Sequence, residues 1–561
     1  MRKNETVRVT VEDINNLGYG VGHLDGLTVF VRGGVTGETV TAKVIKVTKS
    51  YLVALAQEIP ESSPNRCAPD CDSYPACGGC VYRHITYAHE LELKRAYVAN
   101  AFRKAGVNAE VAEVRTTGKT EGYRNKAQYP IMKNPKTGAL EIGFYAGASH
   151  RLIPAGNCRL QPAVFGRISH DVVRFLTEHG VPAYDEETHS GLVRHLYLRR
   201  GEETGEVLLC LVLNGSGFPD EAAFAAEMTA RYPEIVGVLV NENSARTNVV
   251  LGERYRLLAG KDYLTDRLCG LTYRISPESF YQVNHDACEL LYGLAKERAG
   301  LTGHERLIDL YCGIGTIGLT MADRAAEVLG LEIVPQAVEC ARENAMRNGI
   351  VNARFVCGDA GDPGTMLGKA ARLSGGDLSD AVVVLDPPRK GTTRELIAAL
   401  DAYRVPRVVY ISCNPDTLAR DCAVFAAHGY RPGIVTPVDL FPKTGHVETV
   451  VLLSHKKPDG HINVKVEFGE GEGKVPLDNI AKRAETYKPK ERVTYKMIKE
   501  YIEAKYGFKV HTAYIAEVKR DLGLPMYDAP NAVEELKQPR KHPTPEKVEA
   551  IKDALKHFEV I

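Results

Sequence analysis

Between residues 280 and 455, apolar strand-like runs alternate with helix-like stretches, and this alternation constrains the fold more than any other feature of the chain. The runs RLIDLYCGIG, AAEVLGLEIV, ARFVCGD, AVVVLDPPRKG and RVVYISCNP are each followed by a stretch typical of a helix. Strands that alternate with helices predict a doubly wound parallel sheet, which binds ligands beyond the carboxyl ends of its strands. We therefore expect the functional side chains of this region at those strand ends.

Acidic residues stand at three consecutive strand ends: Asp309, Glu332 and Asp359. A G-x-G-x-x-G turn beginning at Gly313 follows the first of them, which alone is weak evidence for a dinucleotide site. Asp309 can meet the ammonium group of S-adenosylmethionine (SAM), Glu332 its ribose hydroxyls and Asp359 its adenine amino group. Each acid could instead cap the following helix, but three in succession favour SAM.

Two later residues indicate nucleophilic catalysis. Cys413 in ISCNPDTLARD ends a strand immediately before a helix, a position that lowers the pKa of a thiol, and Asp386 in LDPPRKG ends the preceding strand. Glu448, close to His446, precedes the final strand. A thiolate that adds to carbon 6 of uracil creates an enolate, whose carbon 5 attacks the methyl group of SAM before a base removes the proton there. Cys413 and Glu448 are our candidates for these two roles.

Four cysteines lie within 14 positions of a loop rich in Pro, Gly and Ser. Cys71, Cys77 and Cys80 form a C-x5-C-x2-C pattern, and a fourth thiolate would come from Cys67 or from a distant residue such as Cys158. Glycine lets such loops wrap inorganic centres. Zinc sites usually carry paired C-x2-C motifs, and the single pair here favours an iron–sulfur cluster. The 13 cysteines and the absence of an apolar leader at the start predict a reducing compartment, hence a cytoplasmic protein.

The remaining segments predict three further parts. Residues 6–58 contain short alternating strands with Gly turns, which predict a five-stranded OB-like barrel of a type that often binds oligonucleotides. Residues 85–275 mix strands and helices and carry basic clusters, which favour an α+β substrate-binding domain. Residues 456–561 form a charged extension with helical signals, among them Thr494 as an N-cap and Gly507 as a stop; its first two helices resemble a helix-turn-helix.

Charge and hydropathy narrow the possible partners. The chain has 71 basic and 71 acidic residues, so nucleic-acid binding would require locally segregated charge. No run approaches the roughly 20 apolar residues that span a bilayer, and we expect no membrane association.

Taken together, these motifs resemble the RNA (uracil-5-)-methyltransferases, specifically the branch that acts on 23S ribosomal RNA. The resemblance covers about residues 5–455 and is carried by GYGVG (as in a TRAM domain), C-x5-CGGC, GYRNKAQ, RHLYLRR, SFYQVN, DLYCGIGTIG, LDPPRKG, ISCNPDTLARD and PKTGHVETV. It implies that Cys413 is the nucleophile and Glu448 the general base. It implies SAM contacts from Gln282, Tyr311, Gly313, Glu332, Asp359 and Asp386. It implies a [4Fe–4S] cluster held by Cys71, Cys77, Cys80 and Cys158, with Cys67 left over.

This resemblance implies a multidomain monomer in four parts. They are a TRAM barrel over 1–60, an α+β domain with the iron–sulfur loop over 61–279, a Rossmann-like SAM methyltransferase domain over 280–456 and a helical extension over 457–561. In SFYQVN, Phe280 and Tyr281 are candidates for stacking on RNA bases, with core packing expected for one of them. Transfer RNA remains an alternative substrate.

Three other classes of protein fit less well. A nicotinamide-dependent oxidoreductase with an iron–sulfur centre would use the same Gly turn, but it leaves Cys413 and Glu448 without a role. A radical-SAM enzyme normally needs C-x3-C-x2-C, which the cysteine spacing does not supply. An RNA-binding protein without catalytic activity would not need the thiol and the acid together.

Overall fold

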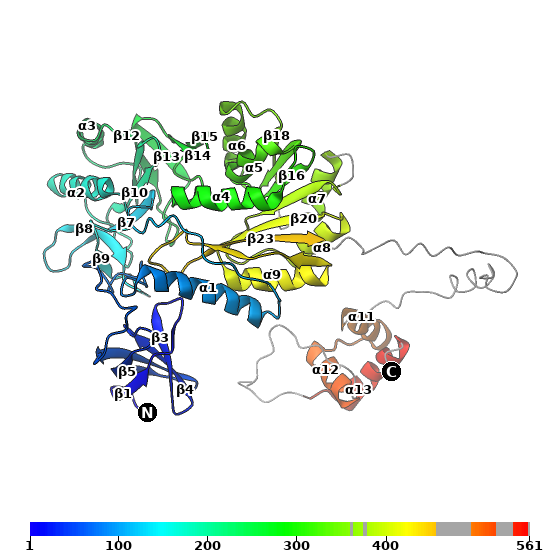
Figure 1. Ribbon diagram of the computed structural model, residues 1–561. Helices are drawn as coiled ribbons and strands as arrows, with labels where there is room; N and C mark the ends of the chain where they lie inside the picture. The colour runs from blue at the N-terminus through cyan, green and yellow to red at the C-terminus, as the bar shows by residue number, and fades with distance from the viewer. Residues whose placement is uncertain (148, 359–362, 374–377, 456–494, 523–541, 559–561) are drawn as a thin grey trace. The chain divides into compact units, whose positions relative to one another are not determined.

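The computed structural model describes the chain except for residues 148, 359–362, 374–377, 456–494, 523–541 and 559–561 (Figure 1). Its contacts divide the chain into two compact units, Met1–Asp459 and Gly460–Ile561. Among the helices of the described ranges, none combines the length and the apolar composition that a membrane crossing requires.

The first unit begins with a small sheet of six strands, one more than the sequence predicts, because Asp13–Ile14 forms a short extra strand. The strands are β1 (Thr6–Thr10), β2 (Asp13–Ile14), β3 (Tyr19–Leu24), β4 (Leu27–Arg32), β5 (Thr39–Val47) and β6 (Tyr51–Glu58), in the order β1-β5-β6-β4-β3-β2. Alternate residues such as Val9, Val29 and Val31 point inward and give this sheet a core of its own.

A long loop that carries four cysteines follows this sheet and leads into α1 (Tyr87–Lys104). Thr86 caps this helix by accepting a hydrogen bond from the His89 backbone N–H. Helix α1 packs against α9 (Pro415–Ala427) of the large sheet described below, and Figure 1 shows the two side by side.

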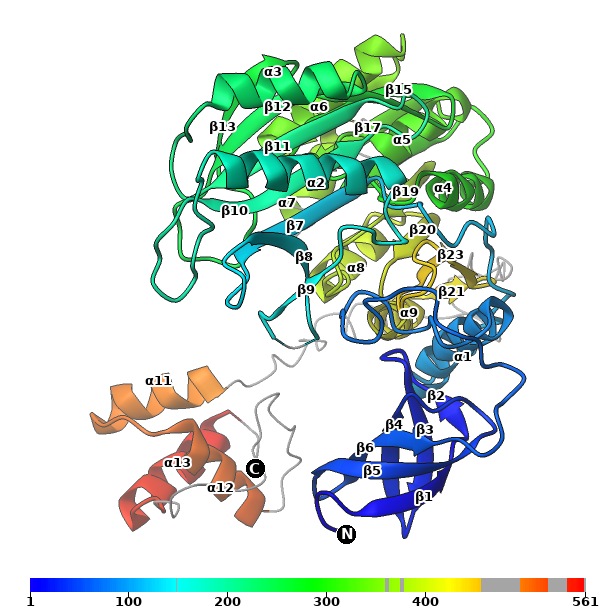
Figure 2. The same cartoon turned by 90° about the vertical axis from the view of Figure 1, so that its left-hand side faces the viewer.

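The central part is a seven-stranded sheet in the order β13-β12-β11-β10-β7-β8-β9. Helices α2 (Ala163–Glu178) and α3 (Glu221–Arg231) cover one of its faces (Figure 2). The strands are β7 (Lys126–Lys133), β8 (Leu140–Tyr145), β9 (Leu152–Pro154), β10 (Val193–Arg200), β11 (Val207–Leu213), β12 (Ile235–Glu242) and β13 (Arg254–Gly260). The other face, with Tyr197 and Leu239, joins the core of the large sheet that follows. A hairpin of β14 (Leu264–Leu268) and β15 (Leu271–Ile275) connects the two parts.

The large sheet has eight strands and is the predicted α/β domain. Strands β16 to β20 are parallel to their neighbours in the order β18-β17-β16-β19-β20, and β23 joins β20 in the antiparallel direction. The strands are β16 (Arg306–Leu310), β17 (Glu327–Glu332), β18 (Ala353–Cys357), β19 (Ala381–Leu385), β20 (Arg407–Ser412), β21 (Tyr430–Pro432), β22 (Thr436–Val438) and β23 (Glu448–His455). All five residues of β19 are buried, as expected for a parallel strand covered on both faces.

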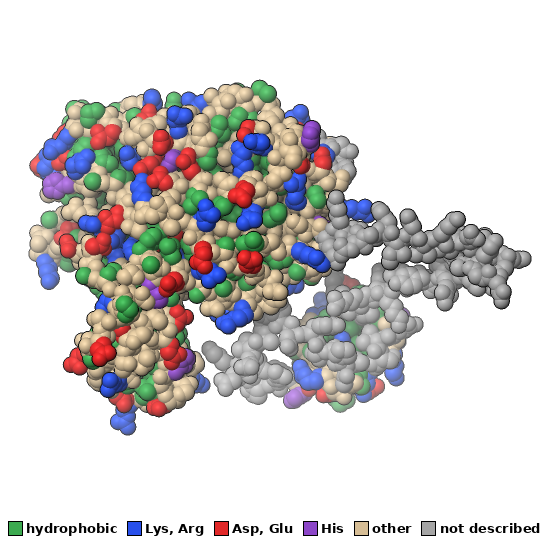
Figure 3. Space-filling view, in the orientation of Figure 1, with side chains coloured by type: hydrophobic (Ala, Val, Ile, Leu, Met, Phe, Trp, Pro, Cys, Tyr) green, Lys and Arg blue, Asp and Glu red, His purple; other side chains and the backbone are tan. Residues whose placement is uncertain are grey.

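Helices cover both faces of the large sheet. One face packs against α4 (His285–Ala299), α5 (Thr316–Met321) and α6 (Pro335–Arg347). The other face packs against α7 (Pro363–Leu373), α8 (Arg394–Ala402) and α9. Acidic and basic side chains intermingle over the face of the first unit that Figure 3 shows, so no large patch of one sign stands out there.

The second unit contains three described helices with a core of their own: α11 (Tyr495–Tyr506), α12 (Thr512–Asp521) and α13 (Pro545–His557). Gly507 adopts φ 71° and ends α11 at the predicted position. Thr494, the predicted N-cap of that helix, lies outside the described residues.

Candidate functional site

The carboxyl edge of the large sheet gathers the residues that the sequence predicts to be catalytic. Strands β19 and β20 are parallel, so Asp386 and Cys413, which follow their last residues, lie at the same edge. Strand β23 pairs with β20 in the antiparallel direction with Ser412 opposite Thr449, so Cys413, which follows β20, and Glu448, the first residue of β23, both adjoin this last pair. A thiol and two carboxyl groups from distant parts of the sequence therefore lie together.

Burial and mutual repulsion favour the protonated forms of these three groups. Burial, followed by the charges of Glu448 and Asp386, raises the pKa of the Cys413 thiol to about 11. Burial, followed by Asp386, raises the pKa of Glu448 to about 8, and burial raises that of Asp386 to about 7. The expected lowering of the thiol pKa was therefore wrong, because lost hydration and two carboxylates outweigh the nearby helix start.

Arg389 opposes this repulsion from the turn that follows β19. Its charge favours the ionised forms of Cys413 and Glu448. The side chains of Asn414 and Thr417 each donate a hydrogen bond of 3.2 Å to the Arg389 carbonyl, which fastens the turn to the start of α9. The Arg389 guanidinium lies 3.5 Å from Nε2 of His446. Desolvation, followed by Arg389, lowers the pKa of His446 to about 4, so this imidazole is neutral near pH 7.

The Gly-rich turn is held by two of the predicted acids. Asp309 is fully buried, and its Oδ2 accepts a hydrogen bond of 2.8 Å from the Gly318 N–H, while Oδ1 has no protein partner. Burial raises the pKa of Asp309 to about 8. Glu332 accepts hydrogen bonds from the N–H groups of Gly313 and Val334, at 3.1 and 3.0 Å. Both acids thus stabilise helix starts, as the alternative interpretation allows, and both also lie at the ligand edge of the sheet.

A cavity of about 140 Å³ opens between this turn and the loop that precedes α4. It is lined by Ser276, Glu278, Ser279, Phe280, Gly313, Glu332, Val334, Gln336, Ala337 and Cys340. Of the predicted SAM contacts, Gly313 and Glu332 belong to this lining, whereas Gln282, Tyr311 and Asp386 do not, and Asp359 lies outside the described residues.

The residues from Ser276 to Phe280 were missed as part of this cavity, because an irregular loop has no periodic sequence signal. Phe280 is 66% exposed at the rim of the cavity, while Tyr281 is 3% exposed and packs in the core, as expected for one of the two.

Arg199 of β10 fixes the shape of that loop from the central sheet. Its side chain is fully buried, and the guanidinium donates hydrogen bonds to the carbonyls of Ser276, Ser279 and Tyr281 at 3.1, 2.6 and 3.5 Å. Arg194 is buried too and donates to carbonyls of a neighbouring loop. Both arginines are therefore structural, although they belong to the basic clusters of this region. Lys126 beside Arg199 has a pKa lowered to about 8 by burial and by Arg199 and Arg124.

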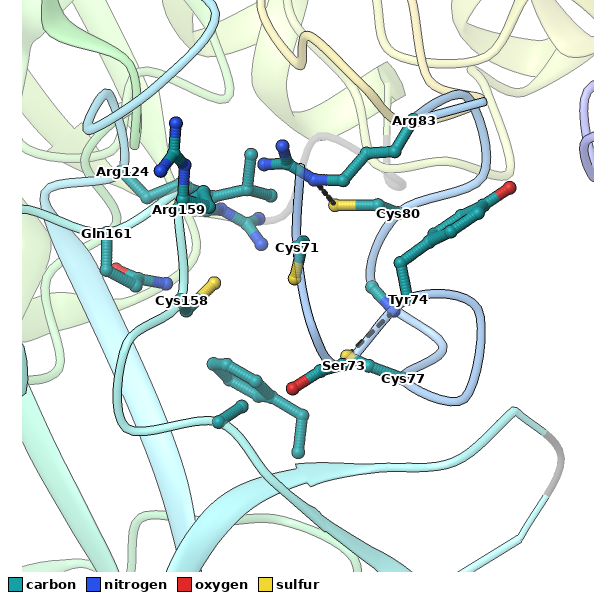
Figure 4. Close-up of a pocket in the computed structure, with 14 residues that line it drawn as sticks. Cys71, Ser73, Tyr74, Cys77, Cys80, Arg83, Arg124, Cys158, Arg159 and Gln161 are labelled. Carbon is teal, nitrogen blue, oxygen red and sulfur yellow. Dashed lines mark hydrogen bonds between the residues drawn. The ribbon is translucent and has the colours of Figure 1, made fainter. Parts of the chain in front are cut away.

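Four of the predicted metal ligands line one pocket. Cys71, Cys77 and Cys80 come from the loop before α1, and Cys158 comes from the segment between β9 and α2. Figure 4 shows their sulfur atoms around a common space. Cys67 is not part of this lining, and its thiol donates to the Arg83 carbonyl at 3.5 Å.

Hydrogen-bond donors and positive charges surround these sulfurs. The Gly79 N–H donates to Sγ of Cys77 and Nε of Arg83 donates to Sγ of Cys80, both at 3.4 Å. Arg124 and Arg159 also line the pocket. Burial raises the pKa of the Cys80 thiol to about 11. Among the described residues, no three His, Cys, Asp or Glu side chains are close enough together to hold a single metal ion.

Comparisons with known proteins identify the family of the chain. A family model described as tRNA (uracil-5-)-methyltransferase matches residues 239–456, and a TRAM domain model matches residues 2–56. An uncharacterized RNA methyltransferase of Halalkalibacterium halodurans is 39% identical over 458 residues, which are 81% of this chain and 98% of the relative. Another from Staphylococcus aureus strain MRSA252 is also 39% identical over 458 residues, 81% of this chain and 99% of the relative.

Among solved structures, a similar one is Pyrococcus abyssi tRNA (uracil-54, C5)-methyltransferase in complex with S-adenosyl-L-homocysteine. It superposes with a TM-score of 0.63 at 26% identity, over 80% of this chain and 100% of that chain. The chain therefore belongs to the family of SAM-dependent RNA (uracil-5-)-methyltransferases, and it carries a TRAM domain ahead of the catalytic part.

Proposed function

We propose that this protein methylates carbon 5 of a uridine in 23S ribosomal RNA, with Cys413 as nucleophile and Glu448 as general base. The observation that carries this proposal is that Cys413, Glu448 and Asp386 lie near one another at the ligand edge of the large sheet. A half-buried thiol near two carboxyl groups suits a reaction in which one proton must leave sulfur and a second must leave carbon.

SAM supplies an electrophilic methyl group on a sulfonium. Cys413 first gives up its proton, for which Asp386 is a suitable acceptor because its pKa of about 7 leaves it partly ionised near neutral pH. The thiolate then forms a bond to carbon 6 of the uracil, and the electron pair of the 5,6 double bond moves into an enolate. Carbon 5 bonds to the methyl group as the sulfonium C–S bond breaks, which leaves S-adenosylhomocysteine.

Glu448 completes the cycle by removing the proton from carbon 5. The electron pair of that C–H bond re-forms the 5,6 double bond and expels the Cys413 thiolate. A carboxylate whose pKa is near 8 is a stronger base than an ordinary glutamate, so the buried position of Glu448 favours this step.

For SAM we propose a site that includes the cavity at the Gly-rich turn, with contacts from Gly313 and Glu332 in its lining, and that extends beyond this cavity to Gln282, Tyr311, Asp359 and Asp386. The unpartnered Oδ1 of the buried Asp309 supports an additional polar ligand group or water near this turn.

The nucleic acid substrate has two candidates. The cysteine motif and the TRAM barrel resemble the 23S branch, whereas the similarity to the Pyrococcus abyssi enzyme favours a transfer RNA uridine as the alternative. Methyl transfer from labelled SAM to unmodified 23S ribosomal RNA and to unmodified transfer RNA, with the product mapped, decides between them. We expect the label in 23S ribosomal RNA. Label in transfer RNA alone would show that a transfer RNA uridine is the substrate instead.

The covalent step has a separate test. RNA that carries 5-fluorouridine should trap the wild-type protein in a denaturation-resistant adduct, because fluorine at carbon 5 cannot be abstracted as a proton. The variant Cys413→Ala should form no adduct and transfer no methyl group, while its affinity for SAM stays close to that of the wild type. Full activity of this variant would exclude the covalent mechanism.

We further propose that Cys71, Cys77, Cys80 and Cys158 hold a [4Fe–4S] cluster. Four thiols around one pocket match the four ligands that such a cluster takes. Arg83, Arg124 and Arg159 would balance the negative charge. Methyl transfer needs no electron carrier, so we assign the cluster a structural role.

Iron content tests this ligand set with a matched pair of variants. The wild type should contain about four irons per chain and absorb broadly in the violet-blue. Cys158→Ser should lose iron, whereas Cys67→Ser, which alters a thiol outside the pocket, should keep it. The reverse pattern would make Cys67 the fourth ligand, and stoichiometric zinc would exclude the cluster.

A further inference from the structure

The loop that leads to Glu448 is held by parts of the chain that are remote from the catalytic sheet. Residues 439–447 connect β22 to β23, and Val438 pairs with Glu448 at the root of this loop. The position of Glu448 against Cys413 therefore depends on how the loop lies.

The cysteine segment holds the loop at Lys443. The N–H groups of Val81 and Tyr82, the two residues after Cys80, both donate to the Lys443 carbonyl, at 3.0 and 3.2 Å. The backbone of Lys443 has φ 68°, a conformation that residues other than glycine rarely adopt. This conformation turns its carbonyl toward the cysteine segment.

Buried charges hold the same loop from α1. The Lys443 N–H donates to Oε1 of Glu90 at 2.7 Å. Nζ of Lys94 bridges Glu90 and Asp439, at 2.8 and 2.7 Å, and both acids are fully or almost fully buried. Such a network tolerates little displacement, because each lost contact would leave a buried charge unpaired.

Two further contacts complete the arrangement. The Tyr123 hydroxyl donates to the Pro442 carbonyl at 2.9 Å. A Cβ at Gly445 would lie 1.8 Å from the carbonyl oxygen of Asn16 in the N-terminal barrel, so this position needs glycine. The barrel, the cysteine segment, the segment before β7 and α1 thus meet on one loop.

We propose that Lys443 is a positioning residue whose main chain transmits the conformation of the cysteine segment to Glu448. The proposal rests on the function assigned to Glu448 above. It predicts that disturbing Lys443 or the cysteine segment impairs removal of the carbon 5 proton more than it impairs SAM binding or thiol addition.

A pair of substitutions at Lys443 separates its backbone from its side chain. Both substitutions remove the ion pair of 3.5 Å between Nζ of Lys443 and Oε2 of Glu90, so this loss is common to the two variants. Lys443→Val also places a β-branched residue at a positive φ, which should displace the carbonyl, whereas Lys443→Gly favours the native conformation. With ordinary uridine RNA, Lys443→Val should accumulate the covalent protein–RNA adduct at least about tenfold over wild type, like a variant that lacks the base. Lys443→Gly should resolve the adduct, and SAM affinity should change by less than about twofold in both variants.

The variant Cys80→Ser tests whether the cysteine segment influences Glu448, and Cys67→Ser is its control. Cys80→Ser should accumulate the same adduct, and Cys67→Ser should not. Thermal melting identifies any variant that does not fold. If a folded Lys443→Val resolves adduct like the wild type, or if Lys443→Gly fails equally, the proposal is wrong. A wild type that forms no adduct with 5-fluorouridine RNA would instead refute the proposed function itself.

Discussion

Glu448 is 3% exposed at the first position of β23, and its replacement by glutamine is the sharpest test of its role. An amide of nearly the same shape cannot accept the carbon 5 proton, so Glu448→Gln should still add to uracil and transfer the methyl group before it stalls. Gel electrophoresis under denaturing conditions should show a stable protein–RNA complex on ordinary RNA. If Glu448→Gln turns over normally, the general base is another group, such as His446 or a water molecule.

The same substitution should change how stability depends on pH. Glu448 has a pKa of about 8 in the folded protein against an ordinary value of 4.5, so between these values the folded state binds the extra proton. Stability therefore falls as pH rises through this range, by up to about 1.4 kcal/mol per pH unit. Glutamine removes this loss, so the melting temperature of Glu448→Gln should rise relative to wild type between about pH 5 and pH 8. Parallel melting curves would contradict the raised pKa.

At the scale of single residues, the sequence predicts which side chains are candidates better than it predicts their pKa values or hydrogen bonds. Cys413 and Glu448 could be chosen as candidates because each stands at a strand end within a distinctive motif, and the structure brings them to the same edge of the sheet. The direction of the thiol pKa could not, because Glu448 and Asp386 come from separate strands and act on Cys413 only after the sheet forms. The sequence also could not predict that Glu332 accepts hydrogen bonds from the Gly313 and Val334 N–H groups, because these contacts form only in the folded turn.

At the scale of elements, Arg199 links the central sheet to the cofactor cavity. Hydrogen bonds from a charged donor contribute about 1.5–3 kcal/mol each, and Arg199→Met would leave several loop carbonyls without one. We expect the affinity for S-adenosylhomocysteine, measured by calorimetry, to fall at least about tenfold. Arg254→Met is a matched control, because the Arg254 side chain is 84% exposed on the same sheet. Unchanged affinity in a folded Arg199→Met variant would show that the loop holds its shape without this arginine.

The alternation of strands and helices predicted the large sheet and its ligand edge, because parallel strands with covering helices leave a strong periodic signal. The loop at 276–280 has no periodic sequence signal, since its shape depends on hydrogen bonds between its carbonyls and Arg199, about 80 residues earlier in the chain. The barrel gained one strand over the prediction because two residues, Asp13 and Ile14, suffice to extend the sheet.

At the scale of the whole molecule, the division after Asp459 predicts that the first unit is active alone. Every residue placed here in the catalytic, cofactor and cysteine sites belongs to that unit, which has its own cores. A chain that ends at Asp459 should keep kcat/KM within about threefold of the full protein. A large rise in KM for RNA, with unchanged SAM affinity, would instead assign RNA binding to the helices after residue 494.

The antiparallel pairing of β23 with β20 also has a consequence for local opening. Cys413 and Glu448 adjoin a ladder that includes the buried Ile411–Val450 and Ser412–Thr449 pairs, so backbone hydrogen bonds hold together the two strands next to them. Amide hydrogens along this ladder should exchange with deuterated solvent only through global unfolding. A change in the loop over residues 439–447 can then shift Glu448 locally while the two strands stay paired.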